Sequence, residues 1–211
     1  MTSNAGPVLC VLAAGASRRL GQPKALVRFG ARSVLEHLLA AGSGCRDRLV
    51  VTGAHDAEIR RALLESEHSG SEDLHVVTNA AWSQGRSGSI GAAHAARPAR
   101  DLLIAPVDVP LVSSAVFEAL CASWTAAGEP ARGFLAPFVR GSDGPPRHGH
   151  PIVLGRELAR EVASAPPDRP LRELRDTAEP RFDVAVADRA ILDDLDSPDD
   201  LEILRRRVAS S

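Results

Sequence analysis

The sequence has few aromatic residues and no tyrosine. Phe and Trp make up 3% of its 211 residues, and the formal net charge is -2. Proteins that bind nucleic acids normally present a basic face and aromatic or arginine platforms for the bases. The composition therefore argues against a nucleic-acid partner and leaves a free nucleotide as a candidate ligand.

Cysteine is scarce as well, and no hydrophobic run is long. Cys10, Cys45 and Cys121 are odd in number and far apart, so neither a disulfide framework nor a CxxC metal site is predicted. The N-terminal segment lacks the features of a signal peptide, and no run approaches the roughly 20 apolar residues of a membrane span. We therefore expect a cytoplasmic protein with no membrane partner.

Short apolar runs alternate with segments of helical spacing along the whole chain. This alternation predicts an α/β fold with right-handed crossovers and a mostly parallel sheet that is covered on both faces. From the length we expect a single domain over residues 1–211. Strands are expected at 7–12, 48–52, 74–78, 101–107, 133–139, 151–154 and 182–187, helices at 34–41, 57–65, 89–96, 114–125, 156–163 and from 197 onward, and a polar loop at 140–147.

A loop with one glycine and three cations follows the first expected strand. Gly15 comes after two alanines, and Arg18, Arg19 and Lys24 follow within a short stretch. Small residues let the backbone approach phosphate oxygens, and the cations neutralise the charge of a triphosphate. The segment fits neither a Walker A loop nor a dinucleotide fingerprint. It predicts a polyphosphate site, and the alternative is a surface turn with solvated arginines.

The string LAAGASRRLGQPKAL, which begins at Leu12, closely resembles the L-A-A-G-x-S-x-R-M-G-x-P-K-x-L signature of the MobA-like NTP transferases, with Leu20 in place of Met. The resemblance implies a Rossmann-like three-layer fold of the nucleotide-diphospho-sugar transferase type. It also implies that the nucleotide lies against Leu12, Ala13, Ala14, Gly15, Arg18, Arg19 and Lys24, with Arg19 and Lys24 taking part in catalysis.

Asp108 follows the strand expected at 101–107, so it should lie at the same edge of the sheet as the opening loop. Mg²⁺ prefers one or two carboxylates together with phosphate oxygens and water. We predict that Asp108 is a magnesium ligand and a catalytic residue; the alternative is that it caps the helix expected near residue 114. The resemblance supports the metal role, because these transferases carry Asp-x-Pro here, as in Asp108-Val109-Pro110.

A second carboxylate is implied by the family pattern D-x-D-T-P-E-D-L, which matches residues 194–201 and makes Asp194 the second metal ligand. Acidic residues also gather at helix N-termini, where the helix dipole favours them. This alternative explains Asp194 equally well. It is the preferred interpretation of Asp196, Asp199 and Asp200, which we expect to be solvated.

The segment from Asn79 to Ile90 combines glycine, hydroxyls and a tryptophan between a strand and a helix. Its hydroxyls and amides suit the edge of a nucleobase, although Ser87 or Ser89 could simply cap the next helix. It resembles the N-x-x-W-x-x-G-x-S-x-S pattern of the branch that includes the molybdenum cofactor cytidylyltransferases. Together with LAAG in place of LAGG, this favours CTP as the nucleotide, bound by Gly85, Ser87 and Ser89.

The acceptor side is expected at residues 147–151. Two histidines two positions apart, without a third ligand nearby, are a weak zinc signal. Gly149-His150-Pro151 instead matches the family's G-H-P or G-N-P element, which implies that Gly149 and His150 contact the acceptor. His148 is expected to lie in a loop without a role.

Taken together, these features predict a Mg²⁺-dependent nucleotidyltransferase. An acceptor phosphate would attack the α-phosphorus of CTP and release pyrophosphate, with molybdopterin as the acceptor and a molybdoenzyme as a client. Two alternatives stay open: a sugar, alditol or choline phosphate as the acceptor, and a nucleotide-binding module that has lost catalysis. The presence of both Lys24 and Asp108 argues against the second.

Overall fold

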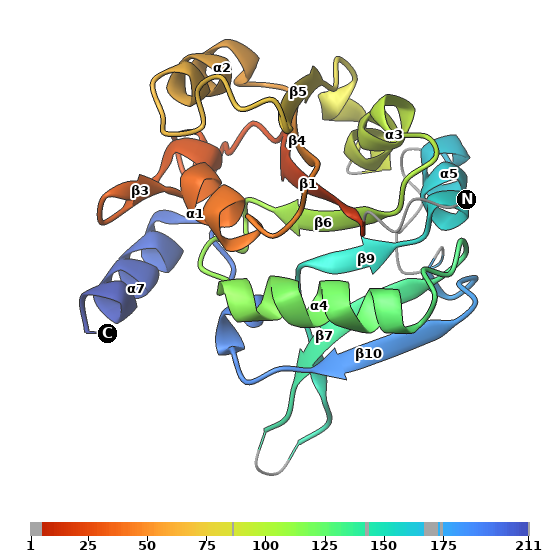
Figure 1. Ribbon diagram of the computed structural model, residues 1–211. Helices are drawn as coiled ribbons and strands as arrows, with labels where there is room; N and C mark the ends of the chain where they lie inside the picture. Colours follow the sequence, from red (N-terminus) through yellow and green to blue (C-terminus); the bar gives the residue numbers. More distant parts are fainter. Residues whose placement is uncertain (1–5, 86, 142–143, 167–172, 174, 211) are drawn as a thin grey trace.

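A computed structural model describes residues 6–85, 87–141, 144–166, 173 and 175–210. Its main sheet has the strand order β10-β7-β9-β6-β1-β4-β5, and β8 pairs with β7 (Figure 1). The strands are β1 (Val8–Ala13), β4 (Arg48–Thr52), β5 (Leu74–Thr78), β6 (Leu102–Pro106), β7 (Phe134–Val139), β8 (Arg147–His148), β9 (Ile152–Leu154) and β10 (Arg181–Ala185).

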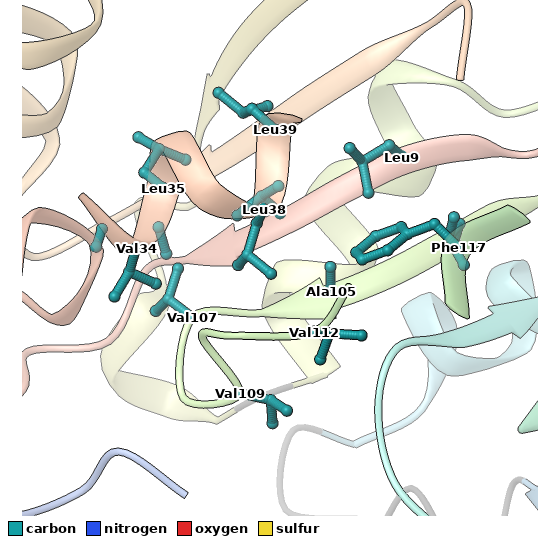
Figure 2. Packing of buried hydrophobic residues seen from close by; sticks show 14 of the residues in the cluster. Leu9, Val34, Leu35, Leu38, Leu39, Ala105, Val107, Val109, Val112 and Phe117 are labelled. Carbon is teal, nitrogen blue, oxygen red and sulfur yellow. The ribbon is translucent and has the colours of Figure 1, made fainter. Parts of the chain in front are cut away.

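Helices cover both faces of this sheet. They are α1 (Val34–Ala41), α2 (Asp56–Leu64), α3 (Ser87–Ala96), α4 (Ser114–Ala126), α5 (Arg156–Ser164) and α7 (Pro198–Ala209). Along β1, side chains alternate between two buried clusters, as the two-residue period of a strand requires. Leu9 packs with residues of α1 and α4, whereas Cys10 packs with residues of α3 and α5. Figure 2 shows Leu38 of α1 and Phe117 of α4 on the Leu9 side.

The predicted fold class is confirmed, and the expected strands and helices lie close to their predicted positions. β1 pairs in parallel with β4 and β6, and β4 with β5, so this half of the sheet is parallel. In the other half, β9 runs antiparallel to both β6 and β7, and β8 runs antiparallel to β7. The last helix begins as predicted, with Ser197 at the N-cap and Pro198 in the first turn.

Three short strands were not predicted. β2 (Arg28–Phe29) and β3 (Arg32–Ser33) form a small antiparallel hairpin before α1. β8 contains Arg147, which the sequence placed in a loop, and pairs antiparallel with β7. Residues 142–143 of the expected loop lie outside the described residues. Within the described part of the chain, no helix has both the length and the apolar character needed to cross a membrane.

A buried carboxylate joins β6 to two helices. Asp101 is 6% exposed and accepts a hydrogen bond from the indole N–H of Trp124 in α4, at 2.9 Å. It also accepts a bond from the backbone N–H of Arg156, the first residue of α5, at 2.8 Å. The Trp124 ring stacks on Phe182 of β10 with 5.8 Å between ring centroids. Asp101 therefore ties both helix layers to the centre of the sheet.

Replacing Asp101 with Ala should destabilise the protein strongly. The change leaves a buried indole N–H and a helix N-terminal amide without an acceptor, which costs about 3 kcal/mol of unfolding free energy. Urea denaturation of D101A and wild type measures the difference. Glu72→Ala is the control, because Glu72 is exposed, and its change should stay within about 0.5 kcal/mol. Equal losses in both variants would contradict this role of Asp101.

Candidate active site

A cavity of about 590 Å³ opens beyond the carboxyl ends of β1 and β6, the usual ligand position in parallel α/β sheets. Its walls come from the loop after β1, the N-terminal half of α3 and the turn after β6. Its lining includes Leu12, Ala13, Ala14, Gly15, Ser17, Arg18, Arg19, Lys24, His55, Ile59, Ser87, Ser89, Ile90, Asp108, His150 and Asp196.

Most residues predicted from the sequence therefore meet in one place. Leu12, Ala13, Ala14, Gly15, Arg18, Arg19, Lys24, Ser87, Ser89, Asp108 and His150 all line this cavity. Three predicted residues, Gly85, Gly149 and Asp194, are not part of its described wall. The residues from separate motifs thus share one cavity, and no wall residue by itself establishes a role.

The loop after β1 is folded back on itself. The backbone N–H groups of Leu20 and Gly21 both donate to the carbonyl oxygen of Ser17, at 3.1 Å each. Ser17 has a positive φ of 51°, and its Oγ accepts from the backbone N–H of Lys24 at 3.1 Å. These bonds place Lys24 beside the cavity, where its side chain is 12% exposed. Arg18 and Arg19 are exposed, as the surface-turn alternative also expects.

The neighbouring loop between β4 and α2 supports the first loop from one side. The backbone N–H of Ala54 donates to the carbonyl oxygen of Ala14 at 3.0 Å. A Cβ atom on Gly53 would lie 2.5 Å from that same oxygen, so the two loops approach as closely as glycine permits. The position of the first loop therefore depends on β4 as well as on β1.

Asp196 forms ion pairs with both Arg19 and Lys24. The hydrogen bond from Lys24 is the main reason why the pKa of Asp196 lies below its usual value. The prediction that Asp196 is a solvated residue of a helix turn is wrong, because it lies in the cavity wall and binds two of the loop cations. Asp200 does act at the helix N-terminus, where it forms a capping box with Ser197.

Carboxylates gather opposite these cations. The backbone N–H of Leu195 donates to the carbonyl oxygen of Asp108 at 2.8 Å, which brings residues 194–196 beside Asp108. Burial raises the pKa of Asp194, and the negative charges of Asp196 and Asp108 raise it further. Asp108 does not cap α4, because the N-cap is Ser113, whose backbone N–H donates to Asp188.

This donor set fits one kind of metal site. No group of three or more His, Cys, Asp or Glu side chains within the described residues could hold a metal ion. A pair of carboxylates beside a phosphate-sized cavity suits a hard divalent cation that completes its shell with phosphate oxygens and water. Asp108 lines the cavity and its charge acts on the nearby Asp194, so these two carboxylates are the candidates for such a site.

The N-terminus of α3 supplies hydroxyl groups to the cavity. Ser89 is buried and accepts a hydrogen bond from the side-chain amide of Asn79 at 3.2 Å. It lies inside α3, so the suggestion that it caps this helix is wrong. Ser87 is the first residue of α3, and the residue before it lies outside the described chain. Both serines line the cavity.

The acceptor-side segment lies against Ile191. The backbone N–H of His150 donates to the carbonyl oxygen of Ile191 at 3.0 Å, and a Cβ on Gly149 would lie 2.0 Å from that oxygen. Gly149 thus allows the close contact that holds His150 at the cavity. His148 is not in a loop but in β8, and its Nε2 lies 3.1 Å from the Asp183 carboxylate.

Several residues of the cavity wall were not predicted from the sequence, among them Ser17, Ile59 and His55. His55 follows β4, and its ring contacts Ala16 in the first loop and Glu58 in α2. The available signal was its position just beyond the carboxyl end of an expected parallel strand, where ligand-binding residues gather. No motif marked it, and Asp196 was assigned to the wrong environment.

Comparison with known proteins gives a family and several solved structures. The MobA-like NTP transferase domain matches residues 9–182. A search of curated proteins found no match. Rv0371c from Mycobacterium tuberculosis is 26% identical, with a TM-score of 0.73 over 95% of this chain and 98% of that chain. Its complex with manganese gives 24% identity and a TM-score of 0.69 over 95% of this chain and 98% of that chain.

Two archaeal structures share the fold. A nucleotidyl transferase from Methanothermobacter thermautotroptrophicus is 22% identical, with a TM-score of 0.74 over 97% of this chain and 98% of that chain. Molybdopterin-guanine dinucleotide biosynthesis protein A from Archaeoglobus fulgidus is 19% identical, with a TM-score of 0.69 over 97% of this chain and 100% of that chain.

Asp194→Asn should stabilise the metal-free protein at pH 7. Because the folded-state pKa of Asp194 is raised, the folded state loses stability as the pH rises from 3.8 through that raised value. The amide removes this repulsion. The free energy of unfolding should rise by less than about 1 kcal/mol, because solvent screens an exposed carboxyl. Urea denaturation at pH 7 and at pH 3 measures the gain, which should vanish at the lower pH.

Asp199→Asn is the matched control, since Asp199 lies in the first turn of α7, where the helix dipole favours its charge. No gain is expected there. If D194N lost as much stability as D199N at pH 7, the proposed repulsion between Asp194 and its neighbouring carboxylates would be contradicted.

Proposed function

The chain belongs to the MobA-like NTP transferase family, and we propose that it transfers CMP from CTP to the phosphate of molybdopterin, with release of pyrophosphate. The observation that carries the proposal is the shared cavity. It brings together the loop cations Arg19 and Lys24, the carboxylate of Asp108 and the α3 hydroxyls. Asp194 lies outside this wall but close enough to Asp108 for the two charges to interact. A triphosphate and a cation need both kinds of group within a few ångströms of one another.

In this reaction an oxygen of the acceptor phosphate forms a bond to the α-phosphorus of CTP. The bond from that phosphorus to the oxygen bridging to the β-phosphate breaks, and pyrophosphate leaves with the electron pair. Arg19 and Lys24 neutralise the charge that moves onto the leaving pyrophosphate. The small residues Ala13, Ala14 and Gly15 let the backbone approach the phosphate oxygens.

We propose that Asp108 and Asp194 hold Mg²⁺. The ion would neutralise phosphate charge and polarise the α-phosphorus when bound. Two observations support this assignment: the repulsion among Asp108, Asp194 and Asp196, and the manganese complex of the related mycobacterial protein. Asp196 pairs with Arg19 and Lys24, and we propose that it releases them when the triphosphate enters.

The choice of CTP and molybdopterin rests on two short segments. LAAG at residues 12–15 and the pattern from Asn79 to Ser89 are typical of the cytidylyltransferase branch. A neighbour in fold is a molybdopterin-guanine dinucleotide biosynthesis protein, which supports molybdopterin as the acceptor class and makes GTP the main competitor. A cytoplasmic molybdoenzyme would be the client that receives the product.

Pyrophosphate release should require CTP, Mg²⁺ and molybdopterin together. The assay combines each of the four NTPs with molybdopterin or with a sugar, alditol or choline phosphate, with and without Mg²⁺. Release with GTP but with none of the other NTPs would overturn the choice of base. Release with another acceptor in place of molybdopterin would overturn the choice of acceptor. No release under any combination would refute the transferase proposal and favour a nucleotide-binding module that has lost catalysis.

Asp108→Asn should lower kcat at least ~100-fold, because the charge that balances the cation at the triphosphate is lost. The neutral variant keeps the shape of the side chain, and matching unfolding midpoints check that it folds. Asp199→Asn serves as the control and should keep wild-type kcat. Wild-type kcat in D108N would remove Asp108 from the metal site.

A further inference from the structure

His55 lies in the wall of the cavity but belongs to none of the motifs used above. It is the N-cap residue of α2, just beyond the carboxyl end of β4. Its Nε2 lies 3.2 Å from the carbonyl oxygen of Ala16, in the middle of the first loop. Its Nδ1 lies 3.2 Å from a carboxylate oxygen of Glu58, one turn along α2. The ring thus bridges α2 and the first loop.

Both partners of the ring are hydrogen-bond acceptors. A backbone carbonyl has no proton to donate, and neither has an ionised carboxylate. A neutral imidazole carries a single N–H and can serve only one of them, whereas an imidazolium serves both. Either form that carries the Nε2–H can donate to Ala16 and so hold the first loop.

The bond to Ala16 also determines how the first loop presents its backbone. Because the peptide unit is planar and trans, fixing the Ala16 carbonyl fixes the Ser17 N–H in the opposite direction. The bond from the Ala54 N–H to the Ala14 carbonyl fixes the Gly15 N–H in the same way. Such N–H groups are the ones that cradle phosphate oxygens in loops of this kind.

We propose that His55 is a positioning residue that holds the phosphate-binding loop through the contact of its Nε2 with the Ala16 carbonyl. This inference rests on the proposed function of the cavity. Glu58 contacts the other ring nitrogen on the side away from the loop.

Loop positioning is tested by amide hydrogen exchange and by binding of inorganic pyrophosphate with Mg²⁺, a probe that needs neither base nor acceptor. In His55→Ala, exchange in residues 14–20 should speed up, and pyrophosphate should bind about tenfold more weakly, as for one lost hydrogen bond. His55→Gln keeps a donor for Ala16, so it should restore slow exchange and most of the affinity.

His75→Ala is the matched control, because His75 is exposed on β5, and it should change neither measurement. Unchanged exchange and affinity in H55A would refute the positioning role. If the wild type binds no pyrophosphate, the proposed function fails. The exchange results would then still decide whether His55 holds the loop.

Discussion

Parallel pairing of β1 with β6 is the constraint on which the site depends. Leu12 pairs with Pro106, and the backbone N–H of Val107 donates to the Leu12 carbonyl at 3.2 Å, so both strands end at one edge of the sheet. The cation-rich loop and Asp108 therefore leave the sheet side by side. The bond from the Leu195 N–H to the Asp108 carbonyl brings a third segment to this edge. β4, on the other side of β1, adds His55.

The convergence of these strand ends concentrates charges of both signs in one cavity. Asp196 pairs with Arg19 and Lys24, while Asp194 bears the repulsion of Asp108 and Asp196. A triphosphate bound to a divalent cation offers phosphates to the first group and positive charge to the second. Ligand binding would then replace an internal ion pair with two complementary contacts. The ion pairs of Asp196 compensate the two cations at this place.

Much of this arrangement could be predicted from the sequence, because apolar runs and turn residues mark elements locally. The direction of a strand could not be predicted, because the apolar run at 152–154 does not show that β9 is antiparallel to its neighbours. Asp196 was misplaced because an acidic residue before a helix has a sufficient local explanation, whereas its side chain is directed by a tertiary contact near Asp108. His55 carried no motif, and its role depends on Ala16, far away in the sequence.

The most direct test of the central claim is a crystal structure with Mn²⁺ and a CTP analogue that carries a methylene group between the α- and β-phosphates. Manganese can be located by its anomalous scattering. The account predicts the ion between Asp108 and Asp194, the phosphates against Gly15, Arg19 and Lys24, and Asp196 released from both cations. An ion bound elsewhere, or a triphosphate outside this cavity, would contradict it.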